Sequence, residues 1–344
     1  MTKTLEYGWP GARDKGDLTY SNLVSETHKD CIFGAVRKFL PKKEFDITRL
    51  HKSSQITGSY KIILDDGEYF LRISERMGDI ELESSIYQKI LESDVNVNKC
   101  IVIGEKITFE SENYRLDIRE FLRGNHYQGK DSELISLVSE LRKFHQALRN
   151  YENAHEVQSN QNRINQAHEK QAKDLISELE KSNYAIFFER ENWARSHRLW
   201  LLESLPFYLE RSKKYSNAKE IQVIHGQIQP GNVIFNNNGA NIFDLETTVK
   251  SFGNVSWDIA YLFQRFCLTN NPTNKEISSR MRIIEEYYPE AMRNIADTMR
   301  LISIYNIISA VDYRINDNRL VPEHEFSKFY NLDLQAREFK NFIN

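Results

Sequence analysis

The sequence contains little cysteine, little proline and no long apolar run, and each scarcity argues against a class of protein. Its 344 residues include three cysteines, Cys31, Cys100 and Cys267, and no two of them form a CxxC pair. An odd number of separated cysteines supports neither a disulfide framework nor a zinc site. Nowhere do about 18 uncharged apolar residues run together, as a membrane-spanning helix needs, and the first residues lack the apolar core of a signal peptide. We therefore expect a cytoplasmic protein that does not enter a membrane.

The sequence also lacks a large excess of charge of either sign. It has 46 Lys and Arg against 49 Asp and Glu, which gives a formal net charge of -3 and a pI near 6.3. A chain with this balance creates no field that attracts phosphate backbones, so we expect no nucleic-acid partner. The content of 40% apolar and 12% aromatic residues, with seven prolines, is typical of a packed globular protein. Small-molecule partners remain open, and the composition does not indicate an oligomeric state.

The first third of the chain changes from helical to strand periodicity and back. Residues 18–40 carry apolar side chains at helical spacing and predict a helix that ends before Pro41. Residues 47–74 alternate apolar and polar side chains around an Asp-Asp-Gly turn, as strands do. A helical stripe returns over 79–92, and residues 99–122 again indicate strands. We expect a small antiparallel sheet with one internal helix.

The rest of the chain is mostly helical. Residues 131–151 begin with a capping-type Asp-Ser pair and carry apolar residues three and four apart. Residues 158–220 are also helical in pattern, and their many charges indicate a solvated face. Two apolar runs, 222–226 and 232–246, interrupt the helices and predict a hairpin turned by Asn-Asn-Asn-Gly. Helices resume over 256–344.

One segment carries a pattern that points to chemistry. His225 to Asn232 reads His-Gly-Gln-Ile-Gln-Pro-Gly-Asn, and Asp244 follows twelve residues after Asn232. Phosphoryl transfer needs oxygen ligands that hold metal ions against the phosphates and a group that orients the nucleophile. A short hairpin would bring Asn232 and Asp244 together as magnesium ligands, and Glu246 is a third candidate.

This segment resembles the H-G-D-x-x-x-x-N loop and the following D-F-E-type triplet of the aminoglycoside phosphotransferase and choline kinase-like family. The resemblance extends from about residue 45 to 265. It implies an α+β, bilobal protein-kinase-like fold, with a small antiparallel-sheet N-lobe and a larger, mostly helical C-lobe. The expected parts are an N-terminal helical extension (1–44), a nucleotide-binding N-lobe (45–122), and a C-lobe (123–344) with the catalytic-loop hairpin and an acceptor cleft. The implied cofactors are ATP, with GTP as an alternative, and Mg²⁺.

The resemblance also assigns roles to residues outside the loop. Arg72 is similar to the basic strand residue that touches the nucleotide phosphates, and Glu83 on the next helix would be its ion-pair partner. The segments around His145 and Asp258 resemble two further signatures of the family, which we interpret as structural supports. Taken alone, an arginine on a strand or a glutamate on a helix is more often an ordinary surface residue.

The remaining nucleotide contacts follow from two loops. The segment Ser-Ser-Gln-Ile-Thr-Gly-Ser-Tyr has one glycine where protein kinases have three, so Gly58 and Ser59 are its candidate phosphate contacts. Residues 118–122 resemble the hinge whose backbone binds adenine, which makes Glu120 and Leu122 candidates there.

The sequence departs from the family at Gln227, where the family has the aspartate that accepts the proton of the substrate hydroxyl. An amide has no useful basicity, although it can orient a hydroxyl or a water. His225 commonly holds this loop by hydrogen bonds. Three functions therefore remain open: a phosphotransferase for a small-molecule acceptor, including an acceptor with no proton to lose, a nucleotide-binding pseudokinase that regulates or scaffolds, and an ATP-dependent transferase of another part of the nucleotide. The sequence favours the first, with His225, Gln227, Asn232 and Asp244 as the catalytic candidates.

The acceptor itself is not identified by the sequence. Family members that act on cationic sugars or choline line this region with acids and aromatic residues. Trp257, Asp312, Tyr313 and the Glu-Glu-Tyr-Tyr run at 285–288 are candidates of this kind, although the run fits an ordinary amphipathic helix better.

Overall fold

The structure is a computed structural model that describes most of the chain. The described residues are 24–40, 45–50, 56–65, 67–75, 77–181, 196–216, 220–269, 271–292, 294–316 and 323–343. Of the N-terminal extension expected over 1–44, residues 1–23 and 41–44 lie outside the described residues, as do residues 51–55 of the loop before Gly58.

The chain forms two compact units. We call their described parts the sheet unit, which is residues 24–128 and 231–246, and the helical unit, which is residues 129–230 and 247–343. The structure thus divides the chain after Gln128, whereas the sequence suggested a boundary after residue 122. It also groups the hairpin near Asp244 with the sheet, whereas we expected this hairpin in the helical part.

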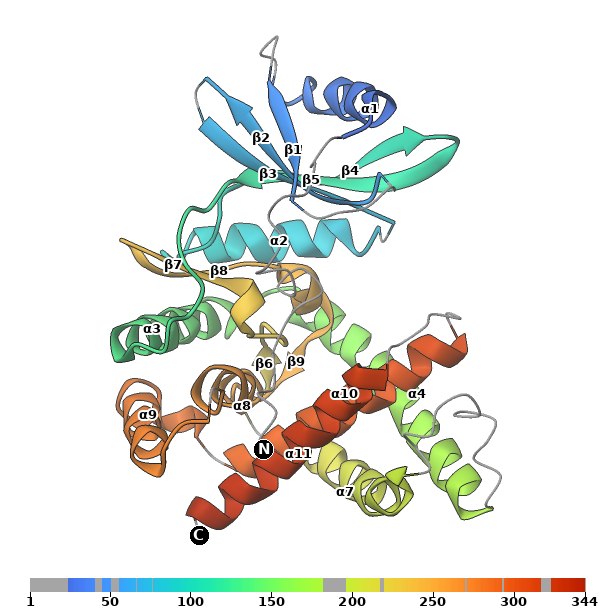
Figure 1. The fold of residues 1–344 in the computed structure, drawn as a ribbon, viewed down its shortest axis with the longest axis vertical. Helices are drawn as coiled ribbons and strands as arrows, with labels where there is room; N and C mark the ends of the chain where they lie inside the picture. The colour runs from blue at the N-terminus through green and yellow to red at the C-terminus, as the bar shows by residue number, and fades with distance from the viewer. Residues whose placement is uncertain are drawn as a thin grey trace. The chain divides into compact units, whose positions relative to one another are not determined.

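Five antiparallel strands form the centre of the sheet unit, in the order β1-β2-β3-β5-β4. The strands are β1 (Asp46–Arg49), β2 (Gly58–Leu64), β3 (Gly67–Ser74), β4 (Cys100–Phe109) and β5 (Glu112–Glu120). Helices α1 (Glu26–Val36) and α2 (Ile80–Leu91) lie on opposite faces of this sheet (Figure 1). Asp79 caps α2 by accepting a hydrogen bond from the N–H of Leu82 at 3.2 Å. The predicted antiparallel sheet with one internal helix is confirmed.

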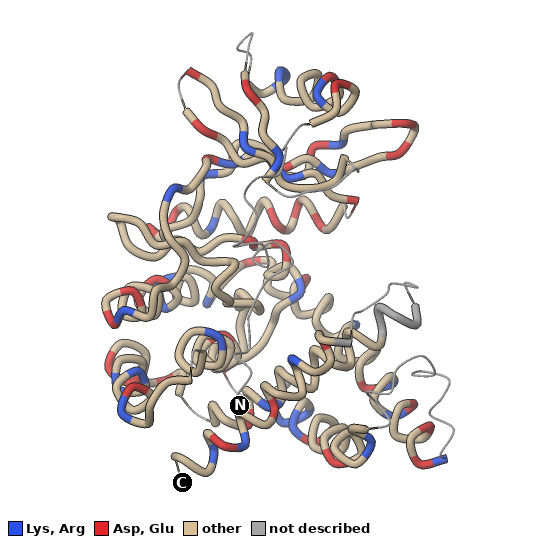
Figure 2. Tube along the Cα trace, viewed as in Figure 1, with Lys and Arg blue, Asp and Glu red and all other residues tan. Residues whose placement is uncertain are grey.

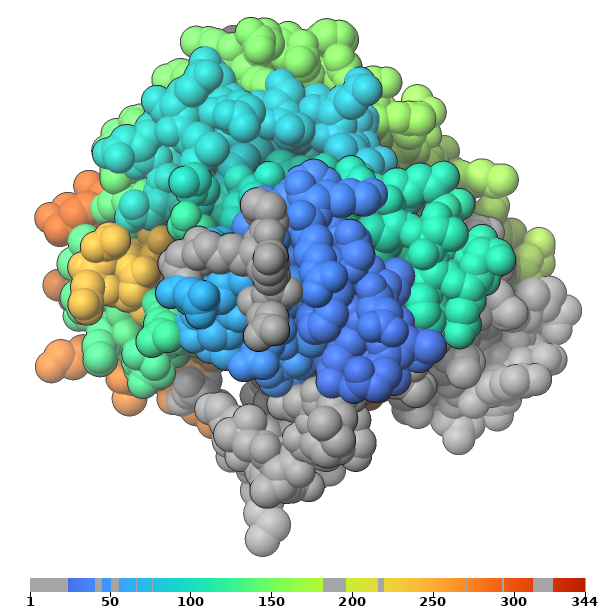
Figure 3. Space-filling view, turned by 90° about the horizontal axis from the view of Figure 1, so that it is seen from above, coloured from blue at the N-terminus to red at the C-terminus, as the bar shows by residue number. Residues whose placement is uncertain are grey.

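The two faces of the sheet differ because side chains alternate along each strand. Leu71 of β3 and Leu116 of β5 are fully buried in one apolar cluster with Ile32 of α1. Figure 3 shows α1 on the surface of this unit, beside the segment that contains β4 and β5. The opposite face carries charges, and there Arg72 of β3 is paired in register with Asp117 of β5. The charged face is therefore the one available for a polar site.

A second, two-stranded sheet completes the sheet unit. It is the hairpin of β7 (Val233–Asn236) and β8 (Gly239–Ile242). The backbones of Asn125 and Phe235 exchange two hydrogen bonds, at 2.9 and 2.8 Å. A β-carbon on Gly124 would lie 2.3 Å from the carbonyl oxygen of Phe235, so glycine permits this close approach. These contacts explain why the hairpin belongs to the sheet unit.

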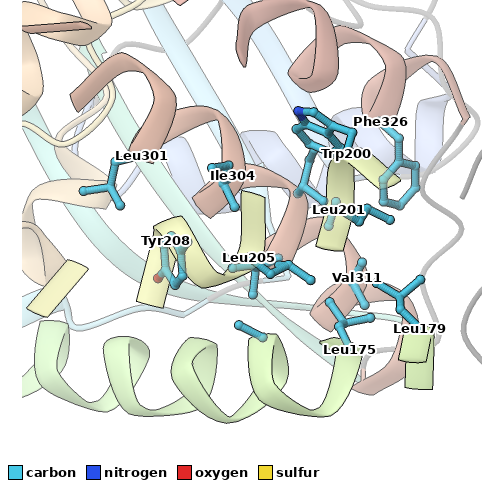
Figure 4. Packing of buried hydrophobic residues seen from close by; sticks show 14 residues of the cluster. Leu175, Leu179, Trp200, Leu201, Leu205, Tyr208, Leu301, Ile304, Val311 and Phe326 are labelled. Atoms are coloured by element: carbon cyan, nitrogen blue, oxygen red, sulfur yellow. The ribbon is translucent and has the colours of Figure 1, made fainter. Parts of the chain in front are cut away.

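The helical unit packs long helices around an apolar core. Its α-helices are α3 (Asp131–Leu148), α4 (Ala154–Glu180), α7 (Arg198–Ser216), α8 (Ser256–Leu262), α9 (Asn274–Tyr287), α10 (Ile295–Asn316) and α11 (Glu323–Ile343). Figure 4 shows part of the core, where Leu175, Leu205, Ile304 and Phe326 come from α4, α7, α10 and α11. Within the described residues, no helix is both long enough and apolar enough to cross a bilayer.

Two short strands frame the start of the predicted catalytic loop. β6 (Gln222–Val223) pairs with β9 (Phe252–Gly253), and not with the hairpin that the sequence suggested. His225 lies three residues after the start of β6. Like β6 and β9, it belongs to the helical unit. Figure 2 shows that Lys and Arg residues are interspersed with Asp and Glu residues along the chain in both units.

Candidate active site

One buried aspartate holds the start of the catalytic loop. Asp258 of α8 is fully buried, and its carboxylate accepts hydrogen bonds from the backbone N–H groups of His225 and Gly226, each at 2.8 Å. The Nε2 atom of His145 lies 2.8 Å from the same carboxylate, and the Nδ1 atom of this ring lies 2.8 Å from the hydroxyl of Tyr288. A buried carboxylate needs such donors because an unpaired charge in a dry interior is costly. Asp258 and His145 therefore support the loop.

The turn at Gly226 requires glycine. Its φ of 83° lies in the left-handed region, and a β-carbon there would lie 2.0 Å from the Oγ atom of Ser251. The carbonyl of His225 accepts a hydrogen bond from the Thr247 hydroxyl at 3.0 Å, and the His225 Nδ1 atom accepts the N–H of Gln227 at 3.3 Å. His225 is fully buried, so its environment suits a role in holding the loop.

Gln227 follows this anchored turn and is partly exposed. It belongs to the helical unit, whereas Asn232, five residues later, belongs to the sheet unit. The predicted catalytic residues are thus divided between the units, with His225 and Gln227 in one and Asn232 and Asp244 in the other. Because an amide can donate and accept hydrogen bonds but cannot take up a proton at neutral pH, Gln227 can position a hydroxyl and not deprotonate it.

In the sheet unit, Arg72, Asp244 and Glu246 form a charged cluster. The Nη1 atom of Arg72 lies 3.1 Å from Oδ1 of Asp244, and its Nη2 atom lies 2.9 Å from Oε2 of Glu246. Burial alone would lower the pKa of Arg72, but the carboxylates of Asp244 and Glu246 raise it. The cluster therefore holds a permanent cation beside two carboxylates, contributed by β3 and by the segment after β8.

The backbone around Asp244 is unusual. Asp244 has a φ of 66°, a left-handed conformation that is uncommon for a residue with a β-carbon and that aspartate tolerates better than most. The N–H of Phe243 donates to the carbonyl of Asn232 at 3.1 Å and joins the two ends of the hairpin. Backbone conformations of this kind persist where the surrounding structure enforces them, often at functional sites.

The oxygen donors around Asp244 suit a magnesium ion that binds together with a phosphate ligand. Such sites supply one or two carboxylates, and water and phosphate oxygens complete the coordination. In the part of the chain that the structure describes, no group of three or more His, Cys, Asp or Glu side chains could hold a metal ion. The predicted ligands Asn232, Asp244 and Glu246 offer two carboxylates and one amide oxygen. This set fits a metal that arrives with a nucleotide better than a permanently bound one.

The predicted ion pair between Arg72 and Glu83 is not formed. Glu83 is 2% exposed, and its carboxylate accepts hydrogen bonds from Arg115 at 2.7 Å and from Arg119 at 3.3 Å. Burial raises the pKa of Glu83, although the two guanidinium groups act in the opposite direction. β5 places these arginines over α2, so both carboxylate oxygens are already bound. The sequence pattern could not show this pairing.

The other nucleotide-binding candidates also lie in the sheet unit. Gly58 begins β2 with a φ of 149°, and Ser59 is paired in register with Arg72. Glu120 ends β5, and Leu122 follows outside the strand. No hydrogen bond to the backbone of Leu122 occurs among the described residues. Their roles in binding nucleotide stay predictions.

A pocket that the sequence did not predict lies in the helical unit beside Gly226. Side chains from α4, α7, α8, α10 and the region of β6 and β9 surround an empty space of about 530 Å³, including the part open to solvent. The Nε1 atom of Trp257 donates to the carbonyl of Gly226 at 3.2 Å. Of the lining residues, only Trp257 is an acceptor candidate on the basis of the sequence. The others come from segments far apart in the chain, and no local pattern unites them.

Comparison with known proteins identifies the family. A profile of the phosphotransferase enzyme family matches residues 48–291, which is more than half of the chain. The chain belongs to the phosphotransferase enzyme family. No curated protein sequence matches it.

Solved structures of this family share the fold at low sequence identity. AMP-bound spectinomycin phosphotransferase APH(9)-Ia aligns with a TM-score of 0.58 and 14% identity, over 81% of this chain and 90% of that chain. A thermostable mutant of aminoglycoside phosphotransferase APH(4)-Ia, in ternary complex with ADP and hygromycin B, aligns with a TM-score of 0.53 and 13% identity. The alignment covers 88% of this chain and 96% of that chain. An aminoglycoside phosphotransferase from Alicyclobacillus acidocaldarius aligns with a TM-score of 0.51 and 12% identity, over 88% of this chain and 92% of that chain. The expected α+β protein-kinase-like fold is confirmed.

Proposed function

We propose that the chain binds ATP with Mg²⁺ through its sheet unit and transfers the γ-phosphoryl group to a hydroxyl of a small-molecule acceptor. The observation that carries this proposal is the cluster of Arg72 with Asp244 and Glu246, at 3.1 and 2.9 Å. It combines a phosphate-binding cation with hard oxygen ligands in a chain of the phosphotransferase family. Two related structures contain AMP or ADP, and one of them also contains the small molecule hygromycin B, which supports a nucleotide cofactor and a small-molecule acceptor.

The residues of the cluster would act through charge and position. Phosphoryl transfer has a loose transition state, so catalysis depends mainly on positioning and electrostatic stabilisation. Arg72 would contact the phosphates, and Asn232, Asp244 and Glu246 would hold Mg²⁺. When bound, the metal neutralises negative charge on the phosphate oxygens. The backbone of Leu122 would bind adenine.

Gln227 would orient the acceptor hydroxyl from the anchored loop. A positioned general base contributes about 10² to 10⁴-fold to rate, and Gln227 cannot supply this contribution. We therefore expect slow turnover that rests on positioning and on the metal.

Gln227 also favours a second function. A pseudokinase that binds nucleotide for a regulatory purpose would keep the Arg72 cluster and dispense with the base. Transfer of another part of the nucleotide is a further alternative, because a fold fixes the ligand site but not the reaction. Turnover distinguishes the pseudokinase from both transferases, and product analysis distinguishes the transferases from each other.

The proposal is tested by combining a melting-temperature assay with an ATP consumption assay over an acceptor panel. Magnesium and ATP together should raise the melting temperature, and ATP with excess chelator should raise it much less. A ligand that binds the native state alone at one hundred times its dissociation constant stabilises that state by about 2.7 kcal/mol. The absence of any shift with millimolar ATP or GTP would remove the nucleotide claim. A clear shift without turnover on any acceptor would favour the pseudokinase.

A further inference from the structure

The pocket beside Gly226 has a composition that restricts its ligand. Twelve described residues line it, and none of them is Asp, Glu, Lys, Arg or His. An ammonium or carboxylate group that entered would lose hydration without gaining an ionic partner, which is costly in a partly dry site. The lining therefore disfavours both aminated sugars and carboxylate acceptors.

Aromatic rings form a fixed wall of this pocket. The ring centroid of Trp257 lies 5.5 Å from that of Tyr215 and 5.5 Å from that of Tyr305. Trp257 donates to the Gly226 carbonyl, and the Tyr215 hydroxyl donates to the carbonyl of Asn254 at 2.5 Å. The wall is thus tied to the backbone of the catalytic loop. Aromatic surfaces of this kind pack well against the apolar C–H face of a ring-shaped ligand.

Polar groups of the same pocket are arranged for hydroxyl groups. The Gln161 amide donates to Oδ1 of Asn165 at 2.9 Å and accepts the N–H of Phe252 at 3.4 Å, which fixes its orientation. Amides and hydroxyls bind ligand hydroxyls as both donors and acceptors.

Tyr208 provides the most specific observation. It is 3% exposed and lines the pocket, yet its hydroxyl has no hydrogen-bond partner among the described residues. Figure 4 shows this hydroxyl pointing away from Leu205, at one end of the apolar core. Burial raises the pKa of Tyr208, so the group stays a donor. The hydroxyl oxygen is not itself buried, so it can donate to a hydrogen-bond acceptor of a ligand in the pocket.

We propose that the pocket binds an uncharged, polyhydroxylated ring, such as a neutral sugar, as the phosphoryl acceptor. This inference rests on the proposed function and names its substrate class. A quaternary ammonium ion could also contact aromatic rings, but it makes no hydrogen bond and would not use the hydroxyl and amide groups of the pocket. In the reaction, the acceptor oxygen bonds to the γ-phosphorus while the bond to the bridging oxygen of ADP breaks. The hydroxyl proton passes to water, because Gln227 cannot accept it.

Ligand-observed NMR on the full chain without nucleotide tests the inference. The probes are glucose and maltose as neutral sugars, glucosamine as the ammonium analogue, glucuronate as the carboxylate analogue, and choline. We expect at least one neutral sugar to bind about tenfold more tightly than the charged probes, because the charged probes find no ionic partner.

Two variants add specificity to the test. Tyr208→Phe removes one hydroxyl and should weaken sugar binding about three- to tenfold, which is the effect of one hydrogen bond. Tyr114→Phe in β5 is the control: it makes the same change in the sheet unit and should leave sugar binding unchanged. Gln161→Glu introduces a carboxylate and should shift the preference toward glucosamine.

The inference is overturned if neither neutral sugar binds at millimolar concentration, if a charged probe binds more tightly, or if Tyr208→Phe leaves binding unchanged. Its failure is distinguishable from failure of the proposed function. Sugar binding without ATP binding would contradict the phosphotransferase and retain a sugar site, whereas ATP turnover without sugar binding would contradict this inference alone.

Discussion

Asp258 and Asp244 follow the same predicted catalytic loop, but their surroundings differ. Asp258 is fully buried, and its partners are two backbone N–H groups and the ring of His145. The side chain of Asp244 is 16% exposed, and its partner is the guanidinium group of Arg72. Asp258 therefore fixes a backbone, whereas Asp244 pairs with a cationic side chain and stays partly accessible.

The same contrast extends to the two candidate ligand sites. The cluster around Arg72 consists of charged side chains. The described residues that line the pocket beside Gly226 are all uncharged. Charge suits the recognition of phosphates and metal ions, while aromatic surface and hydrogen bonds suit a neutral ring. The two sites should therefore respond differently to mutation.

The largest expected effect is on stability. Asp258→Ala leaves two backbone N–H groups and His145 without their acceptor, and each buried donor left unsatisfied costs about 1–3 kcal/mol. Asp244→Ala should cost less than about 1 kcal/mol, since it removes a partly exposed pair. Urea unfolding monitored by circular dichroism gives both values. Equal losses of unfolding free energy in the two variants would contradict the different roles of Asp258 and Asp244.

The next effect concerns pH and a buried histidine that has no ionic partner among the described residues. His168 of α4 is 5% exposed, and burial lowers its pKa from 6.5 to about 4. The folded protein therefore keeps this ring neutral, and the unfolded chain protonates it first as pH falls. Stability should be lost as pH falls from 6.5 to 4, by up to roughly 3 kcal/mol from this residue.

Unfolding free energies of the parent and His168→Gln between pH 7 and 4 test this prediction. The variant should show a shallower loss over this range. Parallel curves for the two proteins would show that His168 is not neutralised by the fold.

Arg72→Ala should weaken ATP binding about tenfold or more, with or without Mg²⁺, because hydrogen bonds to charged groups are strong. Arg123→Ala is the matched control, since Arg123 forms an exposed pair with Glu68 in the same unit. Calorimetric titration with ATP measures both. Unchanged affinity in Arg72→Ala would remove the phosphate role of this residue.

The smallest expected effect is on turnover. Gln227→Asp supplies a carboxylate at the position of the missing base and should raise turnover on a neutral acceptor by at least about tenfold. An acceptor that is already ionised would be repelled, and its turnover should fall. Gln229→Asp makes the same change two residues later and should give no gain. Steady-state ATP consumption with each acceptor, in the presence of Mg²⁺, shows whether Gln227→Asp raises or lowers turnover.

Much of the fold could be predicted from the sequence because local periodicity determines it. Alternation around residues 58–74 predicted β2 and β3, and the helical stripe over residues 79–92 predicted α2. The fixed spacing from His225 to Asp244 was also a local signal. The roles assigned to these two residues and to the nucleotide contacts stay predictions.

The features that the sequence did not reveal depend on contacts between distant segments. Glu83 pairs with arginines of β5 that follow it by more than thirty residues. The β7–β8 hairpin joins the sheet unit through the pairing of Asn125 with Phe235. The neutral pocket needs side chains from helices α4, α7, α8 and α10 together. None of these arrangements leaves a period or a motif.

The most direct test of the account is the magnesium dependence of ATP binding in the parent and in Asp244→Ala, measured by isothermal titration calorimetry. The account predicts that Mg²⁺ tightens ATP binding by the parent at least about tenfold, because the metal links Asp244 to the phosphates. The folded Asp244→Ala variant should bind ATP with the same affinity whether or not Mg²⁺ is present. If this variant bound magnesium-ATP as tightly as the parent, the assignment of Asp244 and the account built on it would be contradicted.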